Sequence, residues 1–149
     1  ESPLFLTLAA DLRLKQNDAP AAAKILRAAY SRYPQERAVV YSLIETLLTV
    51  RQPQEALKVA TDDLLGHATD ATVHALQAKT YAALGQRLQQ HRAQAEAYAL
   101  DGRLDEAIGQ LELAQKAGDG SFQEQSQVDA RLREFRARRA EEKKLAKEK

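Results

Sequence analysis

The sequence predicts an all-α protein assembled from antiparallel pairs of helices. Apolar residues recur at spacings of three and four along almost the whole chain, and no stretch alternates strictly between apolar and polar residues. Alanine and leucine abound, whereas the 149 residues include only five tyrosines, three phenylalanines and no tryptophan. A β-sandwich needs more β-branched and aromatic residues than this, so the composition favours helices. No cysteine is present, which excludes disulfides, cysteine nucleophiles and thiolate zinc sites.

Glycine, proline and short polar turns divide the chain into eight expected helices. Asp18 and Ser121 are suited to cap the helices that follow them, and Pro20 and Pro53 occupy early helical positions where a missing N–H costs nothing. Gly66 is expected to end a helix in the left-handed conformation. Because the turns are short, consecutive helices should pack antiparallel. The expected helices span about residues 4–16, 19–33, 36–51, 53–66, 71–84, 87–101, 104–117 and 122 to near the C-terminus.

The spacing of small residues indicates an internal repeat. Ala22 and Ala56 lie 34 positions apart, and each stands near the start of the second helix of a pair. One alanine and leucine pattern occurs twice, as Ala22-x3-Leu26-x2-Ala29 and as Ala107-x3-Leu111-x2-Ala114. With Pro34 following its first copy, the pattern is the second-helix signature of a tetratricopeptide repeat. Small residues are needed there because the paired helices approach closely.

The spacing then breaks by half a repeat. Ala56 and Ala107 lie 51 positions apart, and Gly85 and Gly102 lie 17 apart. The helix over about 87–101 is therefore expected to pair both with the helix before it and with the helix after it. The predicted organisation is a repeat domain over 1–135 followed by a charged extension over 136–149. Within the domain we expect regular repeats at about 3–36, 37–70 and 88–121, an irregular half-repeat near 71–87, and a capping helix from about 122. A non-repetitive helical bundle is the alternative.

Two segments resemble one known family. These segments are similar to the C-terminal region of BepA-like (YfgC-like) periplasmic zinc metallopeptidases of Gram-negative bacteria: His91-Arg-Ala-Gln-Ala-Glu-Ala-Tyr-Ala-Leu-Asp-Gly-Arg-Leu-Asp-Glu-Ala-Ile-Gly-Gln-Leu-Glu-Leu-Ala and Val128-Asp-Ala-Arg-Leu-Arg-Glu-Phe. The resemblance implies a tetratricopeptide-like right-handed superhelix, a periplasmic location, and a protein–protein interaction module in outer-membrane protein assembly or quality control. A stand-alone tetratricopeptide scaffold or secretion chaperone without protease activity is the alternative function.

The chemistry of that family is absent from this chain. Its zinc site uses a His-Glu-x-x-His helix, in which two imidazoles four residues apart share one face. None of His67, His74 and His91 is followed by Glu, and no two of them lie four apart. We therefore expect no catalytic residue, no metal and no cofactor in this chain, and a catalytic domain upstream of it. Because methionine is also absent, we expect a processed product or an excised fragment.

The resemblance also implies a binding groove. First helices of stacked pairs line a concave surface, which in this family would hold a protein or peptide: the outer-membrane assembly machinery, client proteins or the cognate protease domain. The implied partner-binding positions are Leu4, Thr7, Asp11, Leu14, Tyr41, Glu45, Leu48, Ala75, Lys79, Arg92 and Glu96. Tyr41 is the strongest candidate, since an exposed tyrosine offers rigid area with a polar tip. Repeats that grip C-terminal carboxylates have Lys and Asn where Thr7 and Asp11 stand here, so that clamp is not expected.

Charge is balanced overall but uneven along the chain. The 22 basic and 21 acidic residues give a net charge of +1, whereas residues 131–149 hold nine basic and four acidic residues, a net of +5. The balance, and the lack of aromatic residues among the basic ones, argue against a nucleic-acid partner. No apolar run approaches the roughly 18–20 residues that span a bilayer, so membrane association is expected to be peripheral at most. The tail itself is expected to be a solvated extension.

Overall fold

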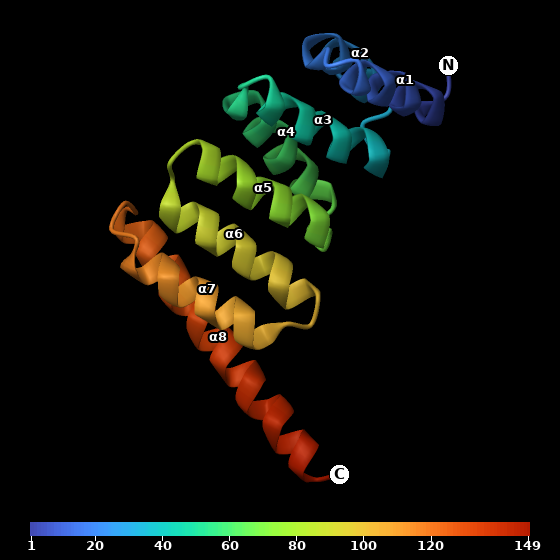
Figure 1. Cartoon of the computed structure of the whole chain (residues 1–149). Coiled ribbons are helices and arrows are strands. Elements are labelled where there is room, and N and C mark those ends of the chain that lie inside the picture. Colours follow the sequence, from blue (N-terminus) through green and yellow to red (C-terminus); the bar gives the residue numbers. More distant parts are fainter. The chain divides into compact units, whose positions relative to one another are not determined.

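Eight α-helices and no strands make up the chain in the computed structural model, which describes residues 1–149 (Figure 1). The helices are α1 (Pro3–Lys15), α2 (Ala19–Arg32), α3 (Arg37–Thr49), α4 (Pro53–Gly66), α5 (Ala71–Ala83), α6 (Arg87–Leu100), α7 (Leu104–Lys116) and α8 (Phe122–Lys147). The predicted all-α fold class is confirmed. The helices group into two compact units, Glu1–Ala68 and Thr69–Lys149.

The caps expected from the sequence are present. Asp18 accepts a hydrogen bond from the backbone N–H of Ala21 at 3.1 Å, which satisfies a donor at the start of α2. Ser121 and Glu124 form a reciprocal capping box at the start of α8. Gly66, however, does not take the left-handed conformation, so that expectation was wrong. The helix ends instead at His67 with φ −135° and ψ 52°, as α2 ends at Tyr33 with φ −131° and ψ 61°, one repeat earlier.

Left-handed residues mark the turn inside each helix pair, and they carry the period of the repeat. Asn17, Arg51 and Gly85 have φ of 60°, 62° and 72°, and each stands one full repeat after the one before it. Gly102 follows only half a repeat later, with φ 76°. One more repeat beyond Gly102 falls on Arg136, which lies within the uninterrupted helix α8. The left-handed turns therefore shift by half a repeat between Gly85 and Gly102, and the series ends where α8 continues.

The first unit consists of two helix pairs, α1–α2 and α3–α4. In addition, α2 packs against α3 and α1 against α3, as successive first helices do in a stacked array. Ala22 and Ala56, the alanines that stand one repeat apart, are both completely buried where the helices meet. Large apolar side chains fill the space beside them, namely Leu26, Val39, Val40, Leu43, Ile44 and Leu47. The small residues let the helices approach, and the large ones close the core.

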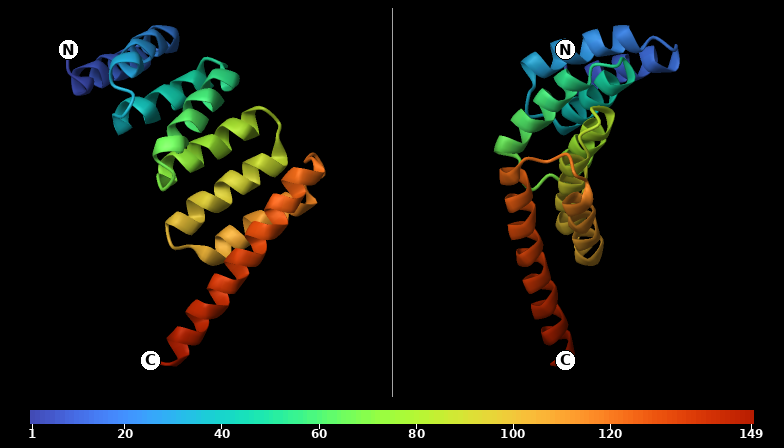
Figure 2. Two further views of the ribbon diagram at one scale, coloured as in Figure 1. Left: turned by 180° about the vertical axis from the view of Figure 1, so that it is seen from behind. Right: turned by 90° about the vertical axis from the view of Figure 1, so that its left-hand side faces the viewer.

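The second unit contains four helices, of which α6 packs against both α5 and α7 and α8 packs against α7 (Figure 2). The double use of α6 that the half-repeat spacing predicts is therefore observed. One core joins α6, α7 and α8, and its buried members are Leu88, Ala95, Leu104, Ala107, Ile108, Leu111, Ala114, Val128, Leu132 and Phe135. Beyond Phe135, α8 runs on past α7 with mostly exposed side chains (Figure 1). None of the eight helices has the length and apolar character needed to cross a membrane.

Candidate partner-binding surfaces

On α1, the four implied positions differ in exposure. Leu4 is 69% exposed and Asp11 is exposed, whereas Leu14 is half-buried. Thr7 is only 7% exposed, and its hydroxyl donates to the carbonyl oxygen of Leu4 at 2.8 Å. The same helix exposes three further apolar residues that the sequence did not single out, Phe5, Leu8 and Leu12. A partner could therefore meet Leu4, Asp11 and part of Leu14, but little of Thr7.

On α3, the three implied positions share one side of the helix because they are four and three residues apart. Glu45 is exposed, and Tyr41 and Leu48 are half-buried. The guanidinium carbon of Arg37 lies 5.9 Å from the centre of the Tyr41 ring, a cation–π contact that fixes where the ring stands. This side of α3 combines an aromatic ring, an aliphatic side chain and a carboxylate, which is a surface suited to a mixed polar and apolar partner.

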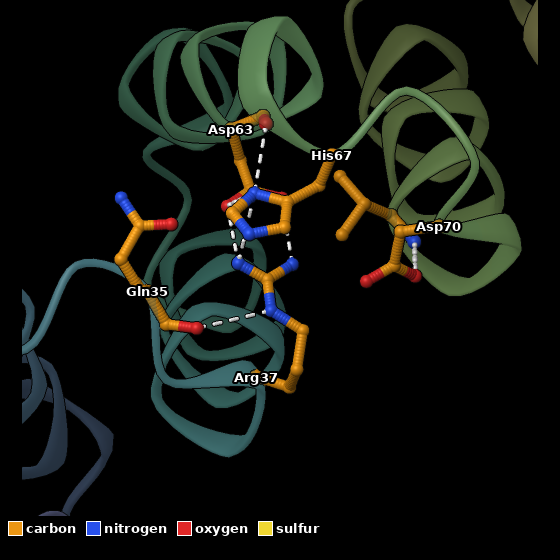
Figure 3. A network of polar contacts seen from close by, with 6 residues as sticks. Gln35, Arg37, Asp63, His67 and Asp70 are labelled. Carbon is orange, nitrogen blue, oxygen red and sulfur yellow. Dashed lines mark hydrogen bonds and ion pairs between the residues drawn. The ribbon is translucent and has the colours of Figure 1, made fainter.

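The buried carboxylate of Asp63 joins α3 to α4 in this first unit, a role that was not predicted from the sequence. Its side chain is 2% exposed and receives two hydrogen bonds from Arg37, at 2.8 and 2.6 Å (Figure 3). Arg37 also donates to the carbonyl of Gln35 at 3.2 Å, and the ring of His67 lies 3.3 Å from both Asp63 and Arg37. The network therefore ties the start of α3 to the end of α4. Arg37 is thus shared between Asp63 and the ring of Tyr41.

In the second unit the implied positions lie on two different surfaces. Lys79 and Ala75 line a hollow of about 510 Å³ together with three glutamines, two further alanines, His91 and Tyr98. Arg92 and Glu96 line another hollow, of about 310 Å³, whose other residues are His74, Gln77, Tyr81, Gln89 and Ala93. Residues 89, 92 and 96 stand on one side of α6, and residues 90, 94 and 98 on the opposite side, since successive helical residues turn by about 100°. The structure therefore does not bring Lys79 together with Arg92 and Glu96.

Arg92 and Glu96 are engaged by α8. Arg92 donates to Gln127 at 2.8 Å, and Glu96 accepts two hydrogen bonds from Arg131, at 2.9 and 2.7 Å. Each of these pairs is 35 residues apart, close to the spacing of equivalent positions on successive first helices. The hydrogen bonds that Arg131 donates to Glu96 are the main cause that raises the pKa of Arg131 above its ordinary value. A partner at this surface would meet side chains that already have partners within the chain.

The loop between α7 and α8 also fixes the start of α6. Asp119 accepts hydrogen bonds from the backbone N–H groups of Arg87 and Leu88, at 2.6 and 2.9 Å. The residue at the N-cap position, Gln86, makes no capping bond with its own side chain. Asp119 therefore caps α6 from a distance, and these bonds, that from Leu88 first, lower the pKa of its carboxyl group. The sequence did not predict this role for Asp119, because its capping partners lie more than 30 residues away.

No cluster of three His, Cys, Asp or Glu side chains is placed to hold a metal ion. His67 belongs to the Asp63 network, and His91 lies 2.9 Å from the side-chain oxygen of Gln110. The residues at the implied positions can contact a partner through exposed apolar and charged side chains on helices.

These helix pairs, with buried alanines and left-handed turns at the spacing of one repeat, are those of a tetratricopeptide repeat, and residues 13–80 match that repeat family. The chain is a tetratricopeptide repeat protein-interaction module. Over 132 residues, 89% of the chain, it is 34% identical to the "Beta-barrel assembly-enhancing protease" of Escherichia coli (strain K12) and 33% identical to the protein of that name from Yersinia pestis. The resemblance inferred from the sequence is therefore confirmed. The chain spans 27% of the length of these relatives.

Solved structures agree on the fold. A double mutant titled "MamA RS-1 ArsTM double mutant" aligns with a TM-score of 0.53 over 97% of this chain and 89% of its own, at 12% identity. A tetratricopeptide repeat protein from Parabacteroides merdae ATCC 43184 aligns with a TM-score of 0.53 over 91% of this chain and 60% of its own, at 18% identity. At these identities the likeness concerns the all-α repeat fold alone.

Proposed function

We propose that this chain is the partner-binding module of a periplasmic metallopeptidase of the β-barrel assembly-enhancing type, acting in outer-membrane protein assembly or quality control. The observation that carries the proposal is the 34% identity over 89% of the chain. The name of these relatives joins a protease to β-barrel assembly. Because the chain spans 27% of their length, proteolysis is assigned to a part of the longer protein outside this chain.

The chain's own contribution would be to hold a protein or peptide. Stacked helix pairs contact mainly their neighbours and leave first-helix side chains free to meet a partner. We assign this role first to the side of α3 that carries Tyr41, Glu45 and Leu48, with Leu4, Asp11 and Leu14 of α1 as further contacts. The partner would be a component of the outer-membrane assembly machinery, a client protein or the cognate protease domain. The module would work without a metal or cofactor of its own.

Site-specific photo-crosslinking in the full-length protein tests this assignment. A crosslinking amino acid replaces Glu45, which is exposed and makes no hydrogen bond through its side chain. The matched control replaces Leu65, which is 85% exposed on α4 of the same unit. We expect crosslinks from position 45 to an outer-membrane assembly component, a client or the protease domain, and few from position 65. Equal labelling from both positions, or none from position 45, would overturn the assigned surface.

The reading frame that encodes this chain tests the finer identity. A His-Glu-x-x-His segment behind a signal peptide is expected upstream, and a zinc titration of the purified chain should show no equimolar binding. A complete frame without that segment would instead favour the stand-alone scaffold or secretion chaperone.

A further inference from the structure

The C-terminal half of α8 carries its charges on separate sides. Successive residues turn by about 100° around a helix, so residues three, four and seven apart share a side. Six basic residues fall within an arc of about 140° on that basis, and no acidic residue falls within it. We call them the basic face of α8: Arg133, Arg136, Arg139, Lys143, Lys144 and Lys147. The carboxylates of this segment, Glu134, Glu141, Glu142 and Glu148, stand on the remaining side.

The chain uses little of this face. Arg136 approaches Glu112 at 3.5 Å and Arg139 approaches Asp105 at 3.3 Å, both near the surface, where such pairs contribute little stability. Lys143, Lys144 and Lys147 are exposed and form no ion pair within the chain, and the same is true of Arg133. A helix of 26 residues is about 39 Å long, roughly twice the length of α7, so this half projects beyond its neighbour (Figure 1). Most charges of the basic face are therefore exposed to solvent and are not neutralised by carboxylates of the chain.

The composition of the basic face indicates which class of ligand it fits: a protein, a nucleic acid or a lipid surface. The centre of a protein–protein interface is apolar and rich in aromatic residues, but the only uncharged residue within the arc is Ala140. Readers of single-stranded nucleic acid stack bases on aromatic side chains, and the arc has none. A row of cations about 21 Å long, without apolar side chains to insert, matches a flat anionic surface. Phosphate-bearing lipid headgroups provide such a surface.

We propose that the basic face of α8 binds an anionic lipid surface, with the C-terminal half of the helix lying along it. The attraction is electrostatic, since nothing in the arc can enter the hydrocarbon layer. Each lysine or arginine near such a surface strengthens binding about fivefold. Binding therefore depends on anionic lipid and weakens as salt screens the charges. This inference does not depend on the function proposed for the other helices.

Vesicle co-sedimentation of the whole chain tests the proposal. One set of vesicles contains phosphatidylcholine alone, and the other contains phosphatidylcholine with one third phosphatidylglycerol. The variant Lys143→Gln/Lys147→Gln removes two charges from the basic face. The matched control, Arg138→Gln/Lys149→Gln, removes one charge from the remaining side of α8 and one from the residue beyond the end of the helix, so both variants have the same net charge. Circular dichroism verifies that both retain the helicity of the parent chain.

The parent chain should sediment with the anionic vesicles only, and should be released at about 0.5 M salt. The basic-face variant should bind about thirtyfold more weakly, and the control less than about threefold more weakly. Equal losses in the two variants would show that net charge acts without the basic face, which overturns the proposal. So would binding to neither set of vesicles, or tighter binding to soluble polyglutamate than to vesicles, which would indicate an acidic protein partner.

Discussion

Replacing Gly85 by alanine should destabilise the protein, although the added methyl group meets nothing. Gly85 has φ 72°, and a Cβ built there has no atom within 4 Å, so packing does not enter the comparison. A left-handed backbone costs an L-residue about 1–2 kcal/mol. Alanine recovers part of this cost, about 0.4–1 kcal/mol, because its unfolded chain is less flexible than that of glycine. The net loss in the free energy of unfolding should be about 1 kcal/mol.

Gly109→Ala is the matched control. Gly109 lies inside α7, has no positive φ, and its added Cβ also meets nothing within 4 Å. The same substitution should therefore stabilise the protein by about 1 kcal/mol, which is the difference in helix propensity between the two residues. Identical chemistry should thus change stability in opposite directions, with the two variants about 2 kcal/mol apart.

Urea denaturation followed by circular dichroism measures both changes, and melting temperatures should move by roughly 3 °C per kcal/mol. The reverse substitution is available one repeat earlier, where Arg51 holds φ 62°, and Arg51→Gly should stabilise by up to about 1 kcal/mol. A Gly85→Ala protein as stable as the parent, or a Gly85→Ala and a Gly109→Ala protein that shift the same way, would refute the strained-turn argument.

Three further predictions concern the charged contacts. Asp63→Asn should lower the free energy of unfolding by about 2–4 kcal/mol, because Arg37 loses the charge of a carboxylate that is 2% exposed. The control Asp62→Asn, at the neighbouring exposed position, should lower it by less than about 0.5 kcal/mol. Equal losses in urea denaturation would contradict this prediction. A double-mutant cycle with Glu96→Gln and Arg131→Gln should give a coupling of about 1 kcal/mol between α6 and α8, and zero coupling would mean that Glu96 is available to a partner. The pKa values of Asp119 and Glu124 are lowered, mainly by backbone hydrogen bonds, so their stabilisation is complete above about pH 5 and is lost as the pH falls through the folded values. Stability should fall in acid, and Asp119→Asn should reduce that dependence; an unchanged acid profile in the variant would exclude the capping role.

The positions of the helices could be predicted because their ends are set by local chemistry. A proline, a capping Asp or Ser, or a glycine decides a boundary through contacts within a few residues, and the structure follows those signals. Gly66 was misjudged because the end of α4 obeys the geometry of the repeat instead of local preference. The residue that caps its C-terminus, His67, has nearly the same φ and ψ as Tyr33 one repeat earlier.

The candidate surfaces were harder to predict because they depend on which side of a helix is covered. Asp63 did carry a signal, since it continues the buried stripe of Ala56, Val59 and Ala60 at helical spacing, and a carboxylate in such a stripe needs a buried partner. That the partner is Arg37, 26 residues away, follows only from the fold. Likewise Arg92 and Glu96 fit the family pattern of free positions, and their engagement by α8 is a tertiary fact.

The packing of α6 against both α5 and α7 affects which sides of the helices face solvent. In an array of regular helix pairs, every first helix lies on the same side of the array and every second helix lies on the other side. Helices α5, α6 and α7 make one and a half repeats, which is an odd number of helices, and α6 lines the hollow of Lys79 with one side and the hollow of Glu96 with the other. Because α6 belongs to two helix pairs, this one helix contributes to two separate hollows, and different residues line each of them.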